Sequence, residues 1–550
     1  MLTYDFSDLK KEPLYDYLYR RIRADILSGR LRPGERMPSK RAFAANLGIS
    51  VITVETAYAQ LTAEGYLSPR PRSGYYVEKI QESLLIPEAE NGAGDVAQGH
   101  MAQGHMAQGY VAQGHGAQEP SAERAGALNL AQEPVAACGV SGNQAQMRKD
   151  AGQKDVPGES RTEEPAREEK HLFIDLAQAG ADPEMFPYPV WSRLMRETLR
   201  TRQRELLERS PGQGLEELRE AIARYLLQYR SLRVSPEQII IGAGTEYLYG
   251  LLIRLLGTEK AYAVESPGYP KTGRIYESSR VTVCPIPMDP AGIDVGQLRK
   301  SGADVVHISP SHQFPTGITM PVSRRSELLS WSAERSGERY IIEDDYDSEF
   351  RLSGRPIPAL MSMDRSGTAI YLNTFTKSVA PTLRIAYMVL PEALLRLYRK
   401  KLGFFSCTVP NFEQYVLAQF LARGYFEKHI NRMRKQYRQK RDLLLGEIGR
   451  SPLGQSVRVE GADAGLHFLM HVKTACSEAE LSALAEEAGV KIYGLSTYAA
   501  APRSGVSVRD AGMPAADPCM VVSYSGLTQE QILSLPGRLQ EAWRPLLPPS

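Results

Sequence analysis

Cysteine is scarce in this chain of 550 residues, which contains five cysteines spread far apart. No CxxC pair or Cys/His cluster has the spacing of a zinc site, so we expect no bound metal and a reducing compartment. No apolar run reaches the length of about 18 residues that a membrane helix needs, and the N-terminal segment lacks the apolar core of a signal peptide. We therefore expect a protein of the cytoplasm without a membrane segment.

An excess of one charge is also missing, because 66 Lys and Arg residues face 64 Asp and Glu residues and leave a net charge of +2. Such a chain is no polycation, so any binding of nucleic acid must come from a local basic patch. The length exceeds the roughly 250–300 residues that one hydrophobic core supports, so at least two domains are expected.

Large apolar residues are rare between residues 81 and 170. This segment holds a five-residue repeat, AQGHMAQGHMAQGYVAQGHGAQ, followed by a stretch rich in Ala, Gln, Gly and Glu. It cannot bury enough surface to offset its ordering entropy, so we predict a disordered linker. His100, His105 and His115 could instead bind a metal, but a repeat without neighbouring structure gives their rings nothing to hold them.

The first 80 residues carry the pattern of a helix-turn-helix. A helix is expected over 13–27, and Ser39 and Ser50 are good N-caps for two short helices joined by a glycine-containing turn. The second short helix would enter the major groove with its N-terminus leading. Residues 67–77 form a basic turn between strand-like ends, which suits a wing. The apolar stripe of the first helix consists of Leu14, Leu18, Ile22 and Ile26.

These landmarks resemble the winged helices of GntR-type regulators over about residues 10–78. The motifs that carry the resemblance are GRLRPG at 29–34, PSKR at 38–41 and EGYL at 64–67. The resemblance implies binding of double-stranded DNA, whereas a winged helix used for protein contacts is the alternative. The family often has Arg after the turn serine, where this chain has Val51, so one phosphate contact is lost. The residues expected at phosphates or base edges are Ser39, Arg41, Ser50, Thr53 and Arg72.

Residues 171–550 alternate between helical and strand patterns. An amphipathic helix opens near 214, and apolar strands between helices predict a parallel sheet covered on both faces, with a smaller C-terminal subdomain. The expected strands are 238–242, 261–265, 305–308 and 340–344.

Lys377 stands after a strand-like segment, with Thr374, Thr376 and Arg384 close to it in sequence. A lysine of this kind can form a Schiff base with pyridoxal phosphate (PLP), while the hydroxyls and the guanidinium suit the phosphate. Burial and nearby cations would favour loss of the lysine proton, which attack on an aldehyde requires. Alone, however, a lysine beside threonines is usually a solvated surface residue.

Asp344 ends a predicted buried strand, where a carboxylate would keep the pyridine nitrogen of PLP protonated. Tyr346 could hydrogen-bond the ring hydroxyl. The alternative is a solvated acidic turn, but an apolar strand leading into it favours a ligand site at the sheet edge. Two weaker candidates are an anion cradle at a helix N-terminus and an aromatic lid, formed by Ala243, Gly244 and Thr245 and by Tyr269, respectively.

Together with SPSHQFPTG at 309–317 and EDDYDSEFR at 343–351, these segments resemble fold-type I aminotransferases over nearly all of 171–550. Joined to the N-terminal module, they resemble the MocR/GabR regulators. The resemblance implies a multidomain chain: a winged helix-turn-helix (1–80), the linker, and an α/β aminotransferase fold with large and small subdomains. It also implies a homodimer in which each DNA module reaches toward the partner's large domain. In each subunit, the resemblance implies PLP joined to Lys377, with its pyridine nitrogen on Asp344 and its ring hydroxyl near Tyr346. The residues that it implies for the phosphate are Ala243, Gly244, Thr245, Thr374, Thr376 and Arg384.

Two departures from aminotransferases bear on activity. Phe314 stands before Pro-Thr-Gly, where the family usually has an asparagine that contacts the ring, and the late strand 520–527 has no arginine to clamp a substrate carboxylate. Arg503 and Arg509, in a nearby loop, could substitute. A missing clamp argues against ordinary amino-acid turnover, because a desolvated carboxylate needs a paired cation.

The sequence thus predicts a PLP-dependent transcription regulator that senses PLP, an amine or an amino acid through an aldimine at Lys377. A working aminotransferase with a DNA-binding appendage is the alternative. A repressor with an inactive scaffold is disfavoured because Lys377 and Asp344 are intact.

Overall fold

The structure is a computed structural model of the chain. The predicted linker with its three histidines, and the residues Arg72, Arg503 and Arg509, lie outside the described residues. No helix of the described part is long and apolar enough to cross a membrane. The described residues are Tyr4, Phe6, 13–70, 73–79, 173–177, 182–352, 357–463, 465–500 and 517–547.

The N-terminal module consists of three helices followed by a two-stranded antiparallel hairpin, as the sequence predicts for a winged helix-turn-helix. Leu18, Ile22 and Ile26 pack into its core, but Leu14 is 40% exposed. The predicted stripe is therefore wrong at its first position, since Leu14 is the first residue of its helix and lies outside the core. The elements are α1 (Leu14–Leu27), α2 (Lys40–Leu47), α3 (Val51–Ala63), β1 (Leu67–Arg70) and β2 (Gly74–Val77).

Both predicted helix caps are confirmed. The Oγ of Ser39 accepts a hydrogen bond from the amide of Ala42 at 3.2 Å, and the Oγ of Ser50 accepts one from the amide of Thr53 at 3.1 Å. Gly48 ends α2 with a φ of 66°, the left-handed conformation that a glycine adopts without strain. Local side-chain chemistry therefore fixes where the two helices of the motif begin and turn.

The large subdomain is built on an eight-stranded sheet in the order β4-β11-β10-β9-β8-β5-β6-β7. β11 is antiparallel to both of its neighbours and β7 is antiparallel to β6, while the other strands share one direction. Their carboxyl ends therefore meet at one edge of the sheet. The strands are β4 (Ile239–Gly242), β5 (Ala261–Ser266), β6 (Thr282–Asp289), β7 (Gly292–Ile293), β8 (Val305–Ile308), β9 (Tyr340–Asp344), β10 (Ala369–Thr374) and β11 (Ala386–Val389).

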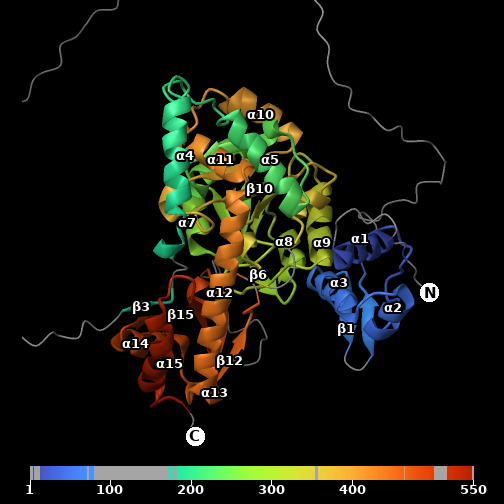
Figure 1. Cartoon of the computed structure of the whole chain (residues 1–550), viewed down its shortest axis with the longest axis vertical. Helices are drawn as coiled ribbons and strands as arrows, with labels where there is room; N and C mark the ends of the chain where they lie inside the picture. The colour runs from blue at the N-terminus through green and yellow to red at the C-terminus, as the bar shows by residue number, and fades with distance from the viewer. Residues whose placement is uncertain are drawn as a thin grey trace, which may run out of the picture. The chain divides into compact units, whose positions relative to one another are not determined.

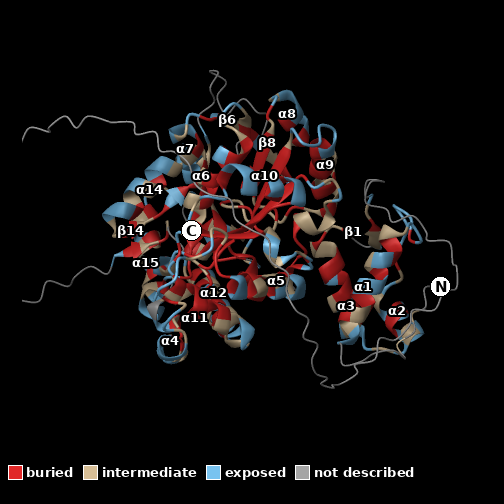
Figure 2. Cartoon of the chain, turned by 90° about the horizontal axis from the view of Figure 1, so that it is seen from above, coloured by how far each residue is buried: buried red, intermediate tan, exposed pale blue. Residues whose placement is uncertain are grey.

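Helices cover both faces of this sheet, which confirms the predicted α/β architecture. Ile342 faces the cluster with α6 and α10, and its neighbour Ile341 faces the cluster with α8 and α9. Figure 2 shows these strands buried between the helices. The helices of the first face are α6 (Thr245–Leu256), α7 (Pro270–Ser278) and α10 (Glu392–Leu402). Those of the other face include α5 (Glu216–Arg230), α8 (Val295–Lys300), α9 (Val322–Ala333) and α11 (Asn411–Ala422), with α4 (Tyr188–Thr201) packed on α11.

The small subdomain contains an antiparallel sheet in the order β12-β13-β16-β15. The long helix α12 (Tyr425–Arg450) runs from the large subdomain into the small one (Figure 1). A short parallel pair joins β3 (Ile174–Asp175) to β14 (Val490–Lys491). The remaining elements are β12 (Val457–Glu460), β13 (His467–Val472), β15 (Tyr493–Gly494), β16 (Cys519–Ser523), α13 (Leu453–Ser456), α14 (Glu478–Glu487) and α15 (Gln529–Trp543).

Two predicted boundaries shift. The helix expected from Gly214 begins at Glu216, because Gly214 has a φ of 91° that a helix does not accept. The strand expected over 520–527 is β16, which ends at Ser523, because a turn closes from the amide of Leu527 to the carbonyl of Tyr524 at 3.2 Å.

Candidate functional site

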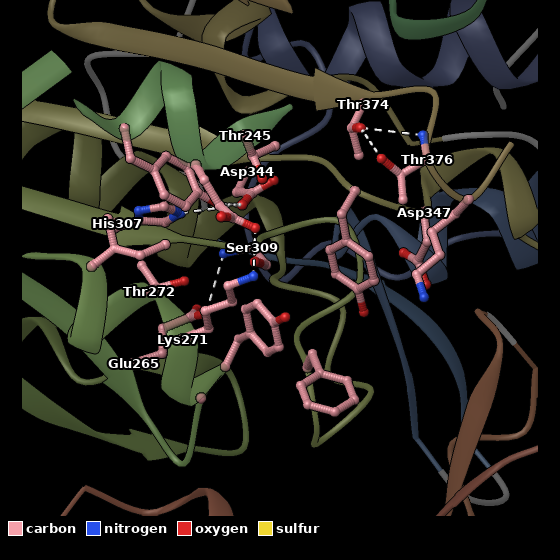
Figure 3. Close-up of a pocket in the computed structure, with 18 of the residues that line it drawn as sticks. Thr245, Glu265, Lys271, Thr272, His307, Ser309, Asp344, Asp347, Thr374 and Thr376 are labelled. Atoms are coloured by element: carbon pink, nitrogen blue, oxygen red, sulfur yellow. Dashed lines mark hydrogen bonds and ion pairs between the residues drawn. The ribbon is translucent and has the colours of Figure 1, made fainter. Parts of the chain in front are cut away.

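A cavity of about 560 Å³ opens where the carboxyl ends of the parallel strands meet (Figure 3). β4, β5, β8, β9 and β10 each lead into a residue that lines it, which is the usual ligand site of an open α/β sheet. Residues that the sequence singled out separately are thus brought together. Those lining the cavity are Thr245, Tyr269, Asp344, Tyr346, Thr374, Thr376, Lys377 and Arg384.

The carboxylate of Asp344, at the end of β9, is held from one side. The Tyr249 hydroxyl donates to its Oδ2, and Nε2 of His307 lies 3.3 Å from the same oxygen. The Tyr276 hydroxyl in turn lies 2.6 Å from Nδ1 of His307. The other oxygen, Oδ1, is buried and has no hydrogen-bond partner among the described residues. Asp344 lines the cavity, so this unpaired carboxylate oxygen fits a protonated ring nitrogen.

Lys377 lies three residues after the end of β10 and lines the cavity. Burial lowers the pKa of its amino group, and the nearby carboxylate of Asp347 acts against that shift. The lowered pKa increases the share of neutral amine, which is the nucleophilic form. The lysine therefore fits a role in binding an aldehyde.

Tyr346 adds a phenol to the cavity wall, and its oxygen lies 3.2 Å from Nδ1 of His312. The same nitrogen lies 2.9 Å from Oδ2 of Asp347. Burial and the charge of Asp347 raise the pKa of Tyr346 well above its ordinary value. The phenol therefore keeps its proton and can donate it to a ligand oxygen.

The anion end of the cavity combines hydroxyls with the start of α6. Thr374 and Thr376 lie with their hydroxyl oxygens 2.7 Å apart, and the amide of Thr376 donates to Thr374 Oγ1 at 3.2 Å. Thr245 is the first residue of α6, where backbone amides point outward. Ala243 does not line the cavity, since its amide donates to Thr408 Oγ1 at 3.0 Å.

Two cations stand at this end beside one carboxylate. Glu246 accepts a hydrogen bond from Lys271 and lies 3.7 Å from Nη2 of Arg384, and the bond from Lys271 lowers the pKa of Glu246. A Cβ on Gly244, which has a φ of +90°, would stand 2.5 Å from the same guanidinium nitrogen. The glycine thus lets Arg384 approach the turn, and the net positive charge suits a phosphate monoester.

Several lining residues were missed from the sequence. Glu265 and His307 are the next-to-last residues of β5 and β8. Ligands of open α/β sheets bind at the carboxyl ends of the strands, so the sequence offered a signal for both. Lys271 and Tyr249 lie on helices, and His467 is on β13 of the small subdomain. Nothing local in the sequence marks these three. No group of three or more metal-ligating side chains occurs within the described ranges.

The predicted DNA-contacting residues lie at the starts of α2 and α3. Ser39, Arg41 and Ser50 are exposed, and Thr53 is half-buried in the first turn of α3. Val51, the departure from the family pattern, is 41% exposed on the same turn. The structure therefore leaves these groups open to a partner.

Comparison with known proteins matches two parts of the chain to two families. Residues 14–77 match the bacterial regulatory proteins of the gntR family, and residues 170–523 match the aminotransferases of class I and II. The chain belongs to the MocR/GabR group of GntR-type transcription regulators. Members of this group join a winged helix to an aminotransferase-type domain. This explains why one chain contains both a winged helix and an aminotransferase-type cavity.

Relatives agree over most of their length. The chain is 35% identical to the uncharacterized HTH-type regulator YdeL of Bacillus subtilis, over 92% of this chain and 94% of that protein. It is 29% identical to the probable rhizopine catabolism regulatory protein MocR of Rhizobium meliloti, over 91% and 90% of the two chains. The kynurenine aminotransferase of Pyrococcus horikoshii superposes with a TM-score of 0.58 at 26% identity, covering 68% of this chain and 91% of that one.

Proposed function

We propose that this MocR/GabR-type regulator binds PLP covalently at Lys377 and that an amine effector changes its affinity for promoter DNA. The observation that carries the proposal is the unpaired Oδ1 of Asp344 in a cavity that also contains Lys377 and a cationic end. A buried carboxylate oxygen without a partner costs about 1–3 kcal/mol, and a ligand N–H bound in the cavity that Asp344 lines would offset this cost.

Each part of the cavity has a role toward PLP. Bound PLP would supply an aldehyde, and Lys377 offers it a primary amine whose lowered pKa increases the neutral share. Asp344 would accept a hydrogen bond from the pyridine nitrogen, and Tyr346 would donate one to the ring oxygen. Thr245, Thr374, Thr376 and Arg384 would hold the phosphate, and Tyr269 would cover the ring.

Regulation requires that the effector favour one DNA-binding state. To shift the ratio of two DNA-binding states from 1:99 to 99:1, the binding free energies of the effector to the two states must differ by about 5.5 kcal/mol. An amine that competes with Lys377 for the same aldehyde would alter contacts where five strands lead into the cavity. We propose that the protein is a cytoplasmic homodimer. In this dimer the altered contacts would change the spacing of the two DNA modules.

A working aminotransferase is the second candidate, and the likeness of the cavity to solved aminotransferases favours it. Sustained production of a keto acid from an amino acid by the full chain would support this candidate. Single-turnover conversion alone would fit the regulator.

The proposal is tested by the visible absorbance of the full-length protein titrated with PLP, followed by borohydride reduction and peptide mass mapping. Wild type gains a band and carries a reduced adduct at Lys377, whereas Lys377→Ala shows neither. Lys260→Ala is the matched control and should behave like wild type, because Lys260 lies outside the lining residues and donates to the carbonyl of Glu338 at 2.7 Å. A band of equal strength in Lys377→Ala, or an adduct elsewhere in wild type, would overturn the proposal.

A further inference from the structure

Two adjacent apolar side chains are exposed at the start of α3, the second helix of the helix-turn-helix. Ile52 is 73% exposed and Val51 is 41% exposed, whereas Val54, Tyr58 and Leu61 of the same helix lie in the core of the module. A single exposed apolar residue is ordinary on a protein surface, but this pair stands on the turn that a helix-turn-helix places against base edges. Burial in the fold does not account for the apolar character of this turn.

The hydroxyl groups of the same turn serve the helix itself. Ser50 Oγ accepts a hydrogen bond from the amide of Thr53, and the hydroxyl oxygens of these two residues lie 2.8 Å apart. The Thr56 hydroxyl donates to the carbonyl of Ile52 at 2.8 Å. These hydroxyls can still contact a phosphate, but the helix already sets their directions.

α3 also lacks the residue types that commonly read purines. In the major groove, arginine and lysine pair with guanine, and asparagine and glutamine pair with adenine. None of the 13 residues of α3, all of which are described, is Arg, Lys or Asn, and its one glutamine, Gln60, is buried and donates to Glu64. Its one charged side chain, Glu55, accepts a hydrogen bond from Lys40 of α2 at 2.6 Å. What α3 offers to a base edge is therefore mainly apolar.

Exposed cations on the neighbouring elements suit the phosphates that flank a groove. Arg41 is exposed on α2 and Arg70 is exposed on β1, and both elements pack against α3. Phosphate contacts position a protein on DNA but carry no sequence information directly, so the choice of sequence must come from base edges or from the shape of the duplex. The module thus has charged groups for the DNA backbone and an apolar pair for the bases.

We propose that Val51 and Ile52 read the 5-methyl groups of thymines in the major groove. The thymine methyl is the apolar group that base pairs present there, and it distinguishes thymine from the other bases. This inference rests on the part of the proposed function in which the protein binds promoter DNA. It narrows the operator to half-sites that have thymine at the positions facing the first turn of α3.

The test starts from sequences that the full-length protein selects out of random double-stranded DNA, where we expect thymine at one or two positions of each half-site. Each such thymine is then replaced by deoxyuridine, which lacks the methyl group and keeps the same hydrogen-bonding groups. Loss of one methyl contact should weaken binding about fourfold, which corresponds to the roughly 0.8 kcal/mol of one buried methylene group. Equal affinity for the thymine duplex and for a duplex with deoxyuridine at all these positions would overturn the inference.

Ile52→Ala connects the preference to one side chain. The variant should bind with nearly equal affinity when the thymine that it no longer contacts is replaced by deoxyuridine. Leu14→Ala is the matched control and should keep the wild-type preference, because Leu14 is 40% exposed in the same module but lies on α1. An Ile52→Ala protein with the full wild-type preference would contradict the role of Ile52. Failure of DNA binding itself looks different and would also end the inference, because the selection would then enrich no sequence.

Discussion

At the scale of single residues, the support of Asp344 decides how the cofactor ring is held. Tyr249 donates to the buried Oδ2 of this carboxylate, and hydrogen bonds to charged groups contribute about 1.5–3 kcal/mol. Tyr249→Phe is therefore expected to lower the free energy of unfolding by that amount in urea denaturation of the PLP-free protein. Tyr262→Phe is the control, since its hydroxyl makes only a long bond of 3.4 Å to Gly257. Equal stability of the two variants would contradict this account of Asp344.

Glu265 predicts a pH dependence of stability. Burial raises the pKa of Glu265 from 4.5 to about 8. Between these pH values the Glu265 carboxyl is ionised in the unfolded chain but protonated in the folded one. The free energy of unfolding therefore falls as the pH rises through this window. Glu265→Gln stays neutral and should lose less stability than wild type between about pH 5 and pH 8, measured as the urea midpoint of PLP-free protein. Parallel profiles of the two proteins would refute the raised pKa.

Individual site residues were predictable where a local signal marks them. Asp344 ends an apolar strand, and Lys377 lies close in sequence to two threonine hydroxyls and to Arg384, so the sequence pointed to all three. Tyr249 and His467 reach the cavity through packing of distant segments, and a single sequence carries no mark of that packing. Ala243 does not line the cavity, and its amide donates to Thr408.

At the scale of elements, the turn between β4 and α6 controls the anion end. A side chain on Gly244 would strain a φ of +90° and push against Arg384 at 2.5 Å. Gly244→Ala is expected to raise the Kd for PLP about tenfold or more, measured by absorbance titration. Gly250→Ala, in the same helix with nothing within 4 Å of its added carbon, should bind PLP like wild type. Equal affinities of the two variants for PLP would contradict a role of Arg384 in binding the phosphate.

Most of the predicted helices and strands are found where helix-capping residues and the apolar pattern of the sequence place them. The caps at Ser39 and Ser50 and the apolar strands β8 and β9 are found where the sequence predicts them. Boundaries shift where a backbone conformation overrides the hydrophobic pattern, as at Gly214. The antiparallel β11, inserted between β4 and β10, has no sequence signal, because strand order depends on contacts between distant segments.

At the scale of the whole molecule, a net charge of +2 means that DNA binding depends on a few exposed side chains. Arg41 is exposed beside the cap of α2, where a phosphate contact is expected. Arg41→Ala should weaken binding to promoter DNA and reduce the slope of log Kd against log salt by about 1. Arg396→Ala, an exposed arginine on α10 with a weak pair to Glu392, should leave the slope unchanged. Equal slopes in Arg41→Ala and wild type would place the DNA contacts elsewhere.

The coupling between the two parts of the chain is tested most directly by the affinity of the PLP-loaded full-length protein for DNA from its own promoter, with and without each member of a panel of amines and amino acids. Coupling between two sites typically changes affinity by about 5- to 150-fold, so at least one amine should change the affinity of wild type by a factor in this range. Lys377→Ala, measured in the same buffer with PLP, should bind DNA equally in both conditions. A variant that still responds to the amine as wild type does would contradict covalent sensing at Lys377.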